Sequence, residues 1–275
     1  MARILADCAD NLNPILLVAP PLLADKPRMA LSTDKILNTA VALVADAAPP
    51  TGAAHLDIGS GHGDLIALLR DRFRLDSSAC DYTADLMRLD GQRVDIADLN
   101  HDPLPYPDAR FDLVTCTEVI EHVENFRRLL RECHRVLKPG GTLVVSTPNI
   151  LNMKSRLRYL LFGFWNLFGP LPVADREKHS TGGHINPVTS FHLNHALLEA
   201  GFADLRLTVD KHQRTSVFLL AVFGLPVVLF GRWLQHRERT KYKTVNTGNW
   251  PHVAQMNSYD VLTGRTIVAR ARKPA

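Results

Sequence analysis

The sequence has few cysteines and no paired cysteine motif. Its four cysteines, Cys8, Cys80, Cys116 and Cys133, are scattered, and the absence of a CxxC pair indicates neither a zinc site nor a redox motif. Cys80 and Cys116 each end an apolar, strand-like run, where small buried hydrophobic residues are expected. A reducing, cytoplasmic location is therefore expected.

The chain also lacks a long apolar run and a strong charge excess. Its longest stretches without a polar residue are 14 residues (217–230) and 11 residues (14–24), whereas a membrane-spanning helix needs about 20. We therefore expect no span, and the acids and prolines near the N-terminus predict no export signal. The 32 basic and 28 acidic residues give a net charge of +4, which does not by itself indicate nucleic-acid binding.

What the sequence does contain is typical of a folded globular protein. Its 275 residues are 46% hydrophobic and 22% charged, which excludes a wholly disordered chain and allows a core without disulfide or metal support. We expect one domain over 1–275, with a helical extension over 1–50 and a ligand-binding core over 51–149. Apolar lid or insertion segments are expected over 150–190 and 211–262.

Strand-like and helix-like segments alternate through the first half. Strands are expected over 53–58, 76–81, 92–96, 111–116 and 142–147. Helices are expected over 32–48, 64–73, 84–89 and 121–137, and further along the chain over 189–202, followed by strands over 205–209 and 266–272. This alternation predicts an α/β, Rossmann-like fold with a mostly parallel sheet and helices on both faces.

A glycine-rich turn follows the first strand, in the sequence HLDIGSGHGDLIALL. Gly59, Gly61 and Gly63, with Ser60 between them, let the backbone turn sharply and approach a ligand closely. Amides at the start of the next helix favour an anionic group. The alternative is that the glycines serve only the geometry of a tight turn.

The residues around this turn restrict the nucleotide. A dinucleotide fingerprint requires a small residue where Asp64 stands, and no GxxxxGK[ST] loop occurs. Asp57 at the strand end disfavours a pyrophosphate and favours a cationic ligand. Asp81 closes the second strand, where a carboxylate can accept hydrogen bonds from both ribose hydroxyls. Asp98 follows the third strand, where it could bind an adenine amino group while Leu99 packs on the ring; each acid alone could also be a surface or capping residue.

The stretch from His55 to Asn149 resembles the class I S-adenosylmethionine-dependent methyltransferases, in the ubiquinone/menaquinone-methyltransferase-like (methyltransferase type 11) branch. The matching segments are LDIGSGHG, LPYPDARFDLV, CTEVIEHV and RVLKPGGTLVVSTPN, with a weaker match over 184–202. The resemblance implies S-adenosylmethionine as the cofactor. It also implies a seven-stranded sheet whose last strand, 266–272, is antiparallel.

The same resemblance assigns residues to the cofactor. Asp57 and the turn 59–63 would line its methionine part, Asp81 with the adjacent Tyr82 its ribose, and Asp98 with Leu99 its adenine. Thr117 and Glu118, just past the fourth strand, would face the cofactor and the acceptor.

Three residues are candidate general bases: Glu118, His122 and His184. Methyl transfer depends mainly on positioning, but a hydroxyl acceptor must lose a proton. His122 could instead cap a helix. His184 lies with His179 in a Gly-rich stretch, which could be an acceptor lid or a solvated loop. No metal site is expected, because these two histidines lack an organised third ligand.

Two apolar segments outside the core, 156–173 and 217–230, suggest the kind of acceptor. The second precedes a basic stretch, so residues 217–243 could contact an anionic membrane surface. Alternatively, both segments form a hydrophobic cap over the acceptor. Either arrangement predicts an apolar or amphipathic acceptor, a small molecule or a lipid-linked molecule, and no nucleic-acid partner is expected. With the activity that the resemblance implies, we expect methyl transfer to this acceptor, at oxygen in the first place, with carbon or nitrogen as alternatives. A non-catalytic cofactor-binding or membrane-associated assembly protein is the alternative; Asp64 argues against a reductase.

Overall fold

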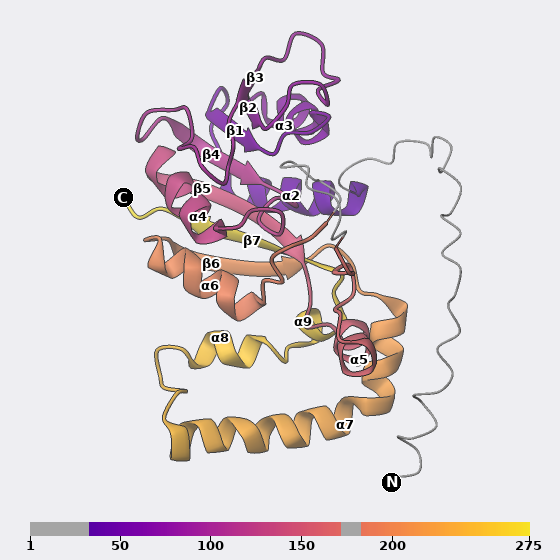
Figure 1. Cartoon of the computed structure of the whole chain (residues 1–275). Coiled ribbons are helices and arrows are strands. Elements are labelled where there is room, and N and C mark those ends of the chain that lie inside the picture. The colour runs from indigo at the N-terminus through magenta and orange to yellow at the C-terminus, as the bar shows by residue number, and fades with distance from the viewer. Residues whose placement is uncertain (1–32, 172–182) are drawn as a thin grey trace, which may run out of the picture. The chain divides into compact units, whose positions relative to one another are not determined.

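A seven-stranded sheet organises the chain, and a computed structural model describes residues 33–171 and 183–275 (Figure 1). The strand order is β3-β2-β1-β4-β5-β7-β6. The strands are β1 (Ala54–Ile58), β2 (Asp76–Asp81), β3 (Val94–Ile96), β4 (Phe111–Cys116), β5 (Leu137–Pro148), β6 (Ala203–Val209) and β7 (Thr266–Arg272).

Only β7 runs against the other strands. It pairs antiparallel with β5 and with β6, whereas β1, β2, β3, β4 and β5 pair in parallel. The predicted mostly parallel sheet with an antiparallel last strand is therefore confirmed. Because parallel strands end at one edge, the residues that follow β1, β2, β3 and β4 meet there, together with the start of β7.

Helices cover both faces of the sheet, as predicted. They are α2 (Asp34–Ala47), α3 (Asp64–Phe73), α4 (Phe126–Val136), α5 (Met153–Phe162), α6 (Ser190–Glu199), α7 (Arg214–Arg237), the π-helix η1 (Glu238–Tyr242), α8 (Trp250–Gln255) and α9 (Tyr259–Thr263). The apolar sides of α2 and α3 pack with Leu113, Val144 and Val268 of the sheet. Side chains of α4 and α6 pack on the opposite face.

The alternation of β1 separates an apolar face from a polar one. Leu56 and Ile58 join the core under α4 and α6, so His55 and Asp57 point to the face that α2 and α3 cover. Both polar side chains are fully or almost fully buried. The sheet thus carries buried polar groups directly beneath the glycine turn.

Two of the helix predictions need correction. Residues 84–89 form turns and bends rather than a helix, because the Arg88 N–H donates to the carbonyl of His62 instead of to a carbonyl one helical turn earlier. The helix predicted over 121–137 begins only at Phe126, where the Asn125 side chain accepts from the Arg128 N–H and caps it. Residues 121–125 form turns beside the sheet edge.

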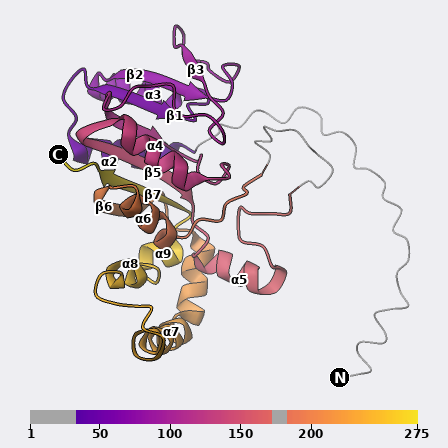
Figure 2. The same cartoon turned by 60° about the vertical axis from the view of Figure 1, so that its left-hand side comes forward.

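The remaining helices leave from the edge where the parallel strands end. The helix α5 follows β5, α7 follows β6, and α9 leads into β7. Figures 1 and 2 show α5, α7, α8 and α9 gathered beyond the β6 side of the sheet. The apolar segments of the sequence therefore lie together, attached at the ligand-binding edge.

Candidate functional site

The glycine turn approaches the neighbouring loop too closely for any side chain. Gly59, Gly61 and Gly63 all have positive φ, and an added Cβ at Gly59 would lie 2.3 Å from Val119 Cγ2. At Gly63, which precedes α3, an added Cβ would lie 2.8 Å from Met87 Sδ. Glycine is therefore required by backbone conformation and by contact. Ser60, inside the turn, is buried, and its hydroxyl has no hydrogen-bond partner among the residues that the structure describes.

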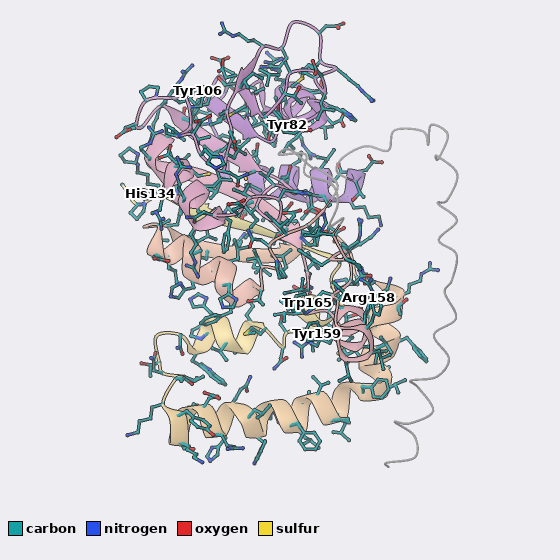
Figure 3. The ribbon with its side chains drawn as sticks, viewed as in Figure 1. Tyr82, Tyr106, His134, Arg158, Tyr159 and Trp165 are labelled. Atoms are coloured by element: carbon teal, nitrogen blue, oxygen red, sulfur yellow. The ribbon has the colours of Figure 1, made fainter. Side chains whose placement is uncertain are left out.

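Asp81 holds the turn in place. This buried carboxylate at the end of β2 accepts from the Gly61 N–H at 2.8 Å and from the Tyr82 N–H at 2.7 Å. Burial raises the pKa of Asp81, and these backbone hydrogen bonds lower it. Each carboxylate oxygen can accept a further bond. Figure 3 shows Tyr82 beside this part of the sheet.

A buried hydrogen-bond relay supports Asp57. The Thr115 hydroxyl donates to the Asp57 carboxylate at 2.6 Å, and His55 Nε2 lies 2.8 Å from the same hydroxyl. Because the hydroxyl has one proton, His55 Nε2 donates to it. His55 Nδ1 then accepts from the Ser77 hydroxyl at 3.0 Å. Burial lowers the pKa of His55 to about 3, so the ring is neutral in this relay.

Asp57 itself lacks a counter-charge among the residues that the structure describes. Burial raises its pKa to about 7; the Thr115 hydrogen bond lowers the pKa and the charge of Asp81 raises it. A buried carboxylate without an ion-pair partner is stabilised by a cationic ligand. The site therefore favours a cation at the end of β1.

The third predicted acid lies in the loop after β3. Asp98 accepts from the Asn100 N–H at 2.9 Å, and its other oxygen lies 2.9 Å from His101 Nδ1. Leu99 is half-buried and packs against the core. The structure thus brings the acids at the ends of β1 and β2 and the acid after β3 to one sheet edge, as their positions predict.

Glu118 is fixed where β4 ends. It has a positive φ of 55°, which is uncommon for a residue with a side chain. Its carboxylate accepts from the Ser146 hydroxyl at 2.9 Å. The same Ser146 hydroxyl oxygen accepts from the backbone N–H of Glu118 at 3.0 Å. Burial raises the pKa of Glu118 to about 7, opposed by Ser146 and by the charge of Arg265. Thr117, just before it, is buried.

His122 and His184, far apart in sequence, are neighbours. Their ring centroids lie 4.8 Å apart in an edge-to-face arrangement. The Glu121 carbonyl accepts from the Ile185 N–H at 2.8 Å and from the Asn186 N–H at 2.9 Å. His122 Nδ1 lies 3.0 Å from the Gly183 carbonyl oxygen. These hydrogen bonds hold segment 183–186 against turn 121–124.

The hydrogen bond of His122 determines its tautomer. A carbonyl only accepts, so Nδ1 carries a proton and Nε2 of the neutral ring carries the lone pair. Burial lowers the pKa of His122, and burial together with the nearby His122 lowers the pKa of His184 to about 4. Both rings are therefore neutral near pH 7. Within residues 33–171 and 183–275, the buried His184 Nδ1 has no hydrogen-bond partner.

Glu121, which is not among the site residues expected from the sequence, completes this group. It is fully buried and both carboxylate oxygens lack a hydrogen bond within the described parts of the chain. Burial, followed by the charge of Glu118, raises its pKa well above the usual range. Its position three residues after Glu118, in the sequence EVIEH, could have indicated a site residue. The sequence pattern instead predicts a helix that begins at residue 121.

The same three side chains are also arranged as metal ligands could be. Ligand-type atoms of Glu121, His122 and His184 lie within 4.8 Å of one another. Carboxylate and imidazole groups suit a divalent transition metal, so this trio could hold one, although the sequence predicted none. His179, the partner considered there, lies outside the described residues.

Comparisons with known proteins agree with this geometry. Residues 33–207 match the family described as methyltransferase domain. The chain is 31% identical over 197 residues to the ubiquinone/menaquinone biosynthesis C-methyltransferase of Desulfotalea psychrophila, covering 66% of this chain and 76% of that protein. It is 32% identical over 153 residues to a probable S-adenosylmethionine-dependent methyltransferase of Mycobacterium tuberculosis, covering 54% of this chain and 47% of that one.

Several relatives are matched only in part. The chain spans 35% of a probable S-adenosylmethionine-dependent methyltransferase from Mycolicibacterium smegmatis, at 44% identity over 93 residues. A solved methyltransferase from Archaeoglobus fulgidus superposes with a TM-score of 0.53 at 17% identity, covering 86% of this chain and 94% of that one. At this identity the superposition shows the shared fold.

Proposed function

Since this chain belongs to the methyltransferase domain family and is an S-adenosylmethionine-dependent methyltransferase, we propose that it methylates an oxygen of an apolar or amphipathic acceptor. The acceptor is a small molecule or a lipid-linked molecule. The observation that carries this proposal is the group at the sheet edge formed by the buried Glu121 and the half-buried His122 and His184, in which a neutral imidazole has a lone pair available.

The residues at the glycine turn fit S-adenosylmethionine. When bound, this cofactor supplies a methyl group already activated on a cationic sulfonium. Asp57 is buried and lacks a counter-charge within the described chain, so it suits the cofactor's ammonium group. Asp81, which also fixes the turn through Gly61, suits the ribose hydroxyls. Asp98 and Leu99 would hold the adenine.

The acceptor side supplies a base. His122 Nε2 can take the proton from an acceptor hydroxyl, because Nδ1 is already committed to the Gly183 carbonyl. The positive charge that then forms on His122 favours the ionised form of Glu121, whose carboxyl burial otherwise keeps neutral. Glu118, with its pKa near 7, lies at the end of the adjacent strand and is a second candidate base.

Two variants test this proposal against the intact protein. We expect His122→Gln and Glu121→Gln to bind S-adenosylhomocysteine in calorimetry as the original protein does. Transfer of labelled methyl to a hydrophobic phenol is expected to fall by about 10²-fold or more. Asp81→Ala is the matched control, because it is expected to lose S-adenosylhomocysteine binding.

Other results would contradict parts of the proposal. Undiminished transfer by both variants would exclude this group as the base. If the protein binds S-adenosylhomocysteine but methylates no oxygen of phenolic or lipid-extracted acceptors, the oxygen acceptor is wrong. Complete lack of turnover would favour the non-catalytic alternative.

A further inference from the structure

The helix α7 exposes an unusual amount of apolar surface. Among its residues only Ser216 is buried. Leu225 is 71% exposed, and Phe218 and Phe230 are each 66% exposed. The helix contacts α5, α9 and η1 along its length, but these leave most of its apolar side chains uncovered. Exposed apolar surface of this extent marks a site of interaction.

The tip of α5 extends the same surface. Leu160 is 80% exposed and Leu161 76% exposed. Behind them, the rings of Tyr159 and Trp165 stack at 4.4 Å, so the loop after α5 is folded against its helix (Figure 3). We call the exposed apolar residues of α5 and α7 the apolar surface: Leu160, Leu161, Phe162, Phe218, Val222, Phe223, Leu225, Leu229, Phe230 and Leu234.

A basic and aromatic cluster adjoins this surface at the C-terminal end of α7. It consists of Arg232, Trp233, Arg237, Arg239, Lys241, Tyr242 and Lys243. The Arg237 guanidinium lies 4.9 Å from the centre of the Trp233 ring and 5.6 Å from that of Tyr242. Glu238 is the one acid between residues 232 and 243. Apolar residues followed by cations and aromatic rings match a membrane interface with anionic lipids.

The chain's path decides how the helix meets a bilayer. The segment from Arg214 to Tyr242 is long and apolar enough to cross a membrane, by length and composition alone. However, its apolar part of 14 residues is about 21 Å long, shorter than a hydrocarbon core of about 30 Å. Residues 243–249 then return the chain to α8, which packs on α6, and seven residues reach at most about 25 Å. Both ends of α7 therefore stay on the side of the methyltransferase core.

We propose that the apolar surface inserts into one leaflet of an anionic membrane, with the basic cluster on its phosphate headgroups. In this arrangement α7 lies in the membrane interface and does not cross the bilayer. The cations require an anionic partner, which an apolar face of a second copy, or the uncharged run 14–24 of this chain, does not offer. The partner is thus a lipid surface.

The surface is joined to the acceptor group by a short segment, and this part of the inference rests on the proposed function. Ser155 in α5 accepts from the Asn166 N–H at 2.9 Å. The buried Phe168 ring that follows lies 5.0 Å from the His184 ring. An acceptor carried in the membrane would therefore meet the base at the end of this segment.

Flotation of the full chain with vesicles tests the membrane contact. We expect it to float with vesicles of phosphatidylcholine and phosphatidylglycerol, and more weakly with phosphatidylcholine alone. Leu225→Glu with Phe230→Glu should lower partitioning by about tenfold or more on both. Arg239→Glu with Lys241→Glu should lower it only on the anionic vesicles. The matched controls are Leu198→Glu, at an exposed position of α6, and Arg72→Glu, at an exposed position of α3; both should float normally.

S-adenosylhomocysteine binding separates this inference from the proposed function, because every variant named should retain it. Failure of the original chain to float with either vesicle would overturn the membrane contact. Equal loss in the controls would overturn it too. A third outcome would also overturn it. In this outcome the original chain does not float and sediments as a dimer, and Leu225→Glu with Phe230→Glu converts the dimer to a monomer.

Discussion

At the scale of single residues, the relay under β1 defines how Asp57 is presented. Thr115 is its central member, because its hydroxyl donates to Asp57 and accepts from His55. Thr115→Val keeps the shape but removes the hydroxyl that donates to Asp57 and the acceptor of His55 Nε2. We expect a loss of about 2–3 kcal/mol in the free energy of unfolding and weaker S-adenosylhomocysteine binding. Denaturant titration and calorimetry measure the two effects.

The matched control for that variant is Thr208→Val, at a half-buried position of β6 away from the site. It should change the free energy of unfolding by less than about 0.5 kcal/mol. Equal effects of the two substitutions would mean that the relay does not position Asp57.

Gly59 allows a second residue-scale test, because the chain holds a matched glycine. Gly59 and Gly91 have φ of 69° and 72°, but an added Cβ meets Val119 at 2.3 Å only at Gly59. Gly91→Ala should cost about 1 kcal/mol of unfolding free energy from backbone strain. Gly59→Ala should cost about 3 kcal/mol or more and abolish S-adenosylhomocysteine binding.

The clash can be tested separately from the backbone strain. Adding Val119→Ala to Gly59→Ala removes the Val119 Cγ2 methyl group with which the new Cβ clashes. Part of the lost free energy of unfolding should therefore return. If Gly59→Ala is no worse than Gly91→Ala in thermal unfolding, the turn does not pack against Val119 as described.

At the scale of elements, the contact between 121–124 and 183–186 assembles the acceptor group. The Asn186 side-chain amide donates to the carbonyls of Val123 and Glu124. Asn186→Ala should loosen His184 from His122, so we expect kcat to fall by about tenfold with unchanged S-adenosylhomocysteine affinity. Asn38→Ala, at an exposed position of α2, is the control and should alter neither. A parallel loss of cofactor affinity in Asn186→Ala would mean that this contact supports the cofactor side.

The sequence predicted the elements whose signals are local. The strands 76–81, 111–116 and 266–272 have the predicted bounds. The predictions failed where contacts with residues distant in the sequence determine the local structure. Met87 beside Gly63 belongs to a turn that packs on the glycine loop, and turn 121–125 is bound to residues 183–186. No periodicity within either segment records those partners.

At the scale of the whole molecule, composition shows which segments are apolar but not whether other segments of the protein bury them. Core strands and α7 are similarly apolar in sequence, yet β5 is buried over its second half and α7 is exposed. The acids of the cofactor side could be placed from sequence because each lies at or just after the end of a strand. The acceptor group could not, because Glu121 and His184 come together only through the fold.

The raised pKa of Asp57 links cofactor binding to pH. Folding keeps the carboxyl protonated up to about pH 7, above the usual carboxyl pKa of about 3.9. The cofactor-free protein therefore loses stability from this group as pH rises from about 4 to 7. Asp57→Asn should remove that dependence. Thermal unfolding of both proteins across this range measures it, and Glu118 supplies a similar slope that persists in the variant.

Binding of the cofactor product should show the opposite pH dependence. An ammonium group favours ionised Asp57, and with a pKa of about 7 the ionised fraction rises about tenfold from pH 6 to pH 8. The affinity for S-adenosylhomocysteine should rise by about the same factor, and binding at pH 6 should release a proton. Calorimetry in two buffers of different ionisation enthalpy measures that proton. Asp57→Asn should bind weakly, independently of pH, and release none; a pH-dependent affinity that survives in this variant would assign the proton to another group.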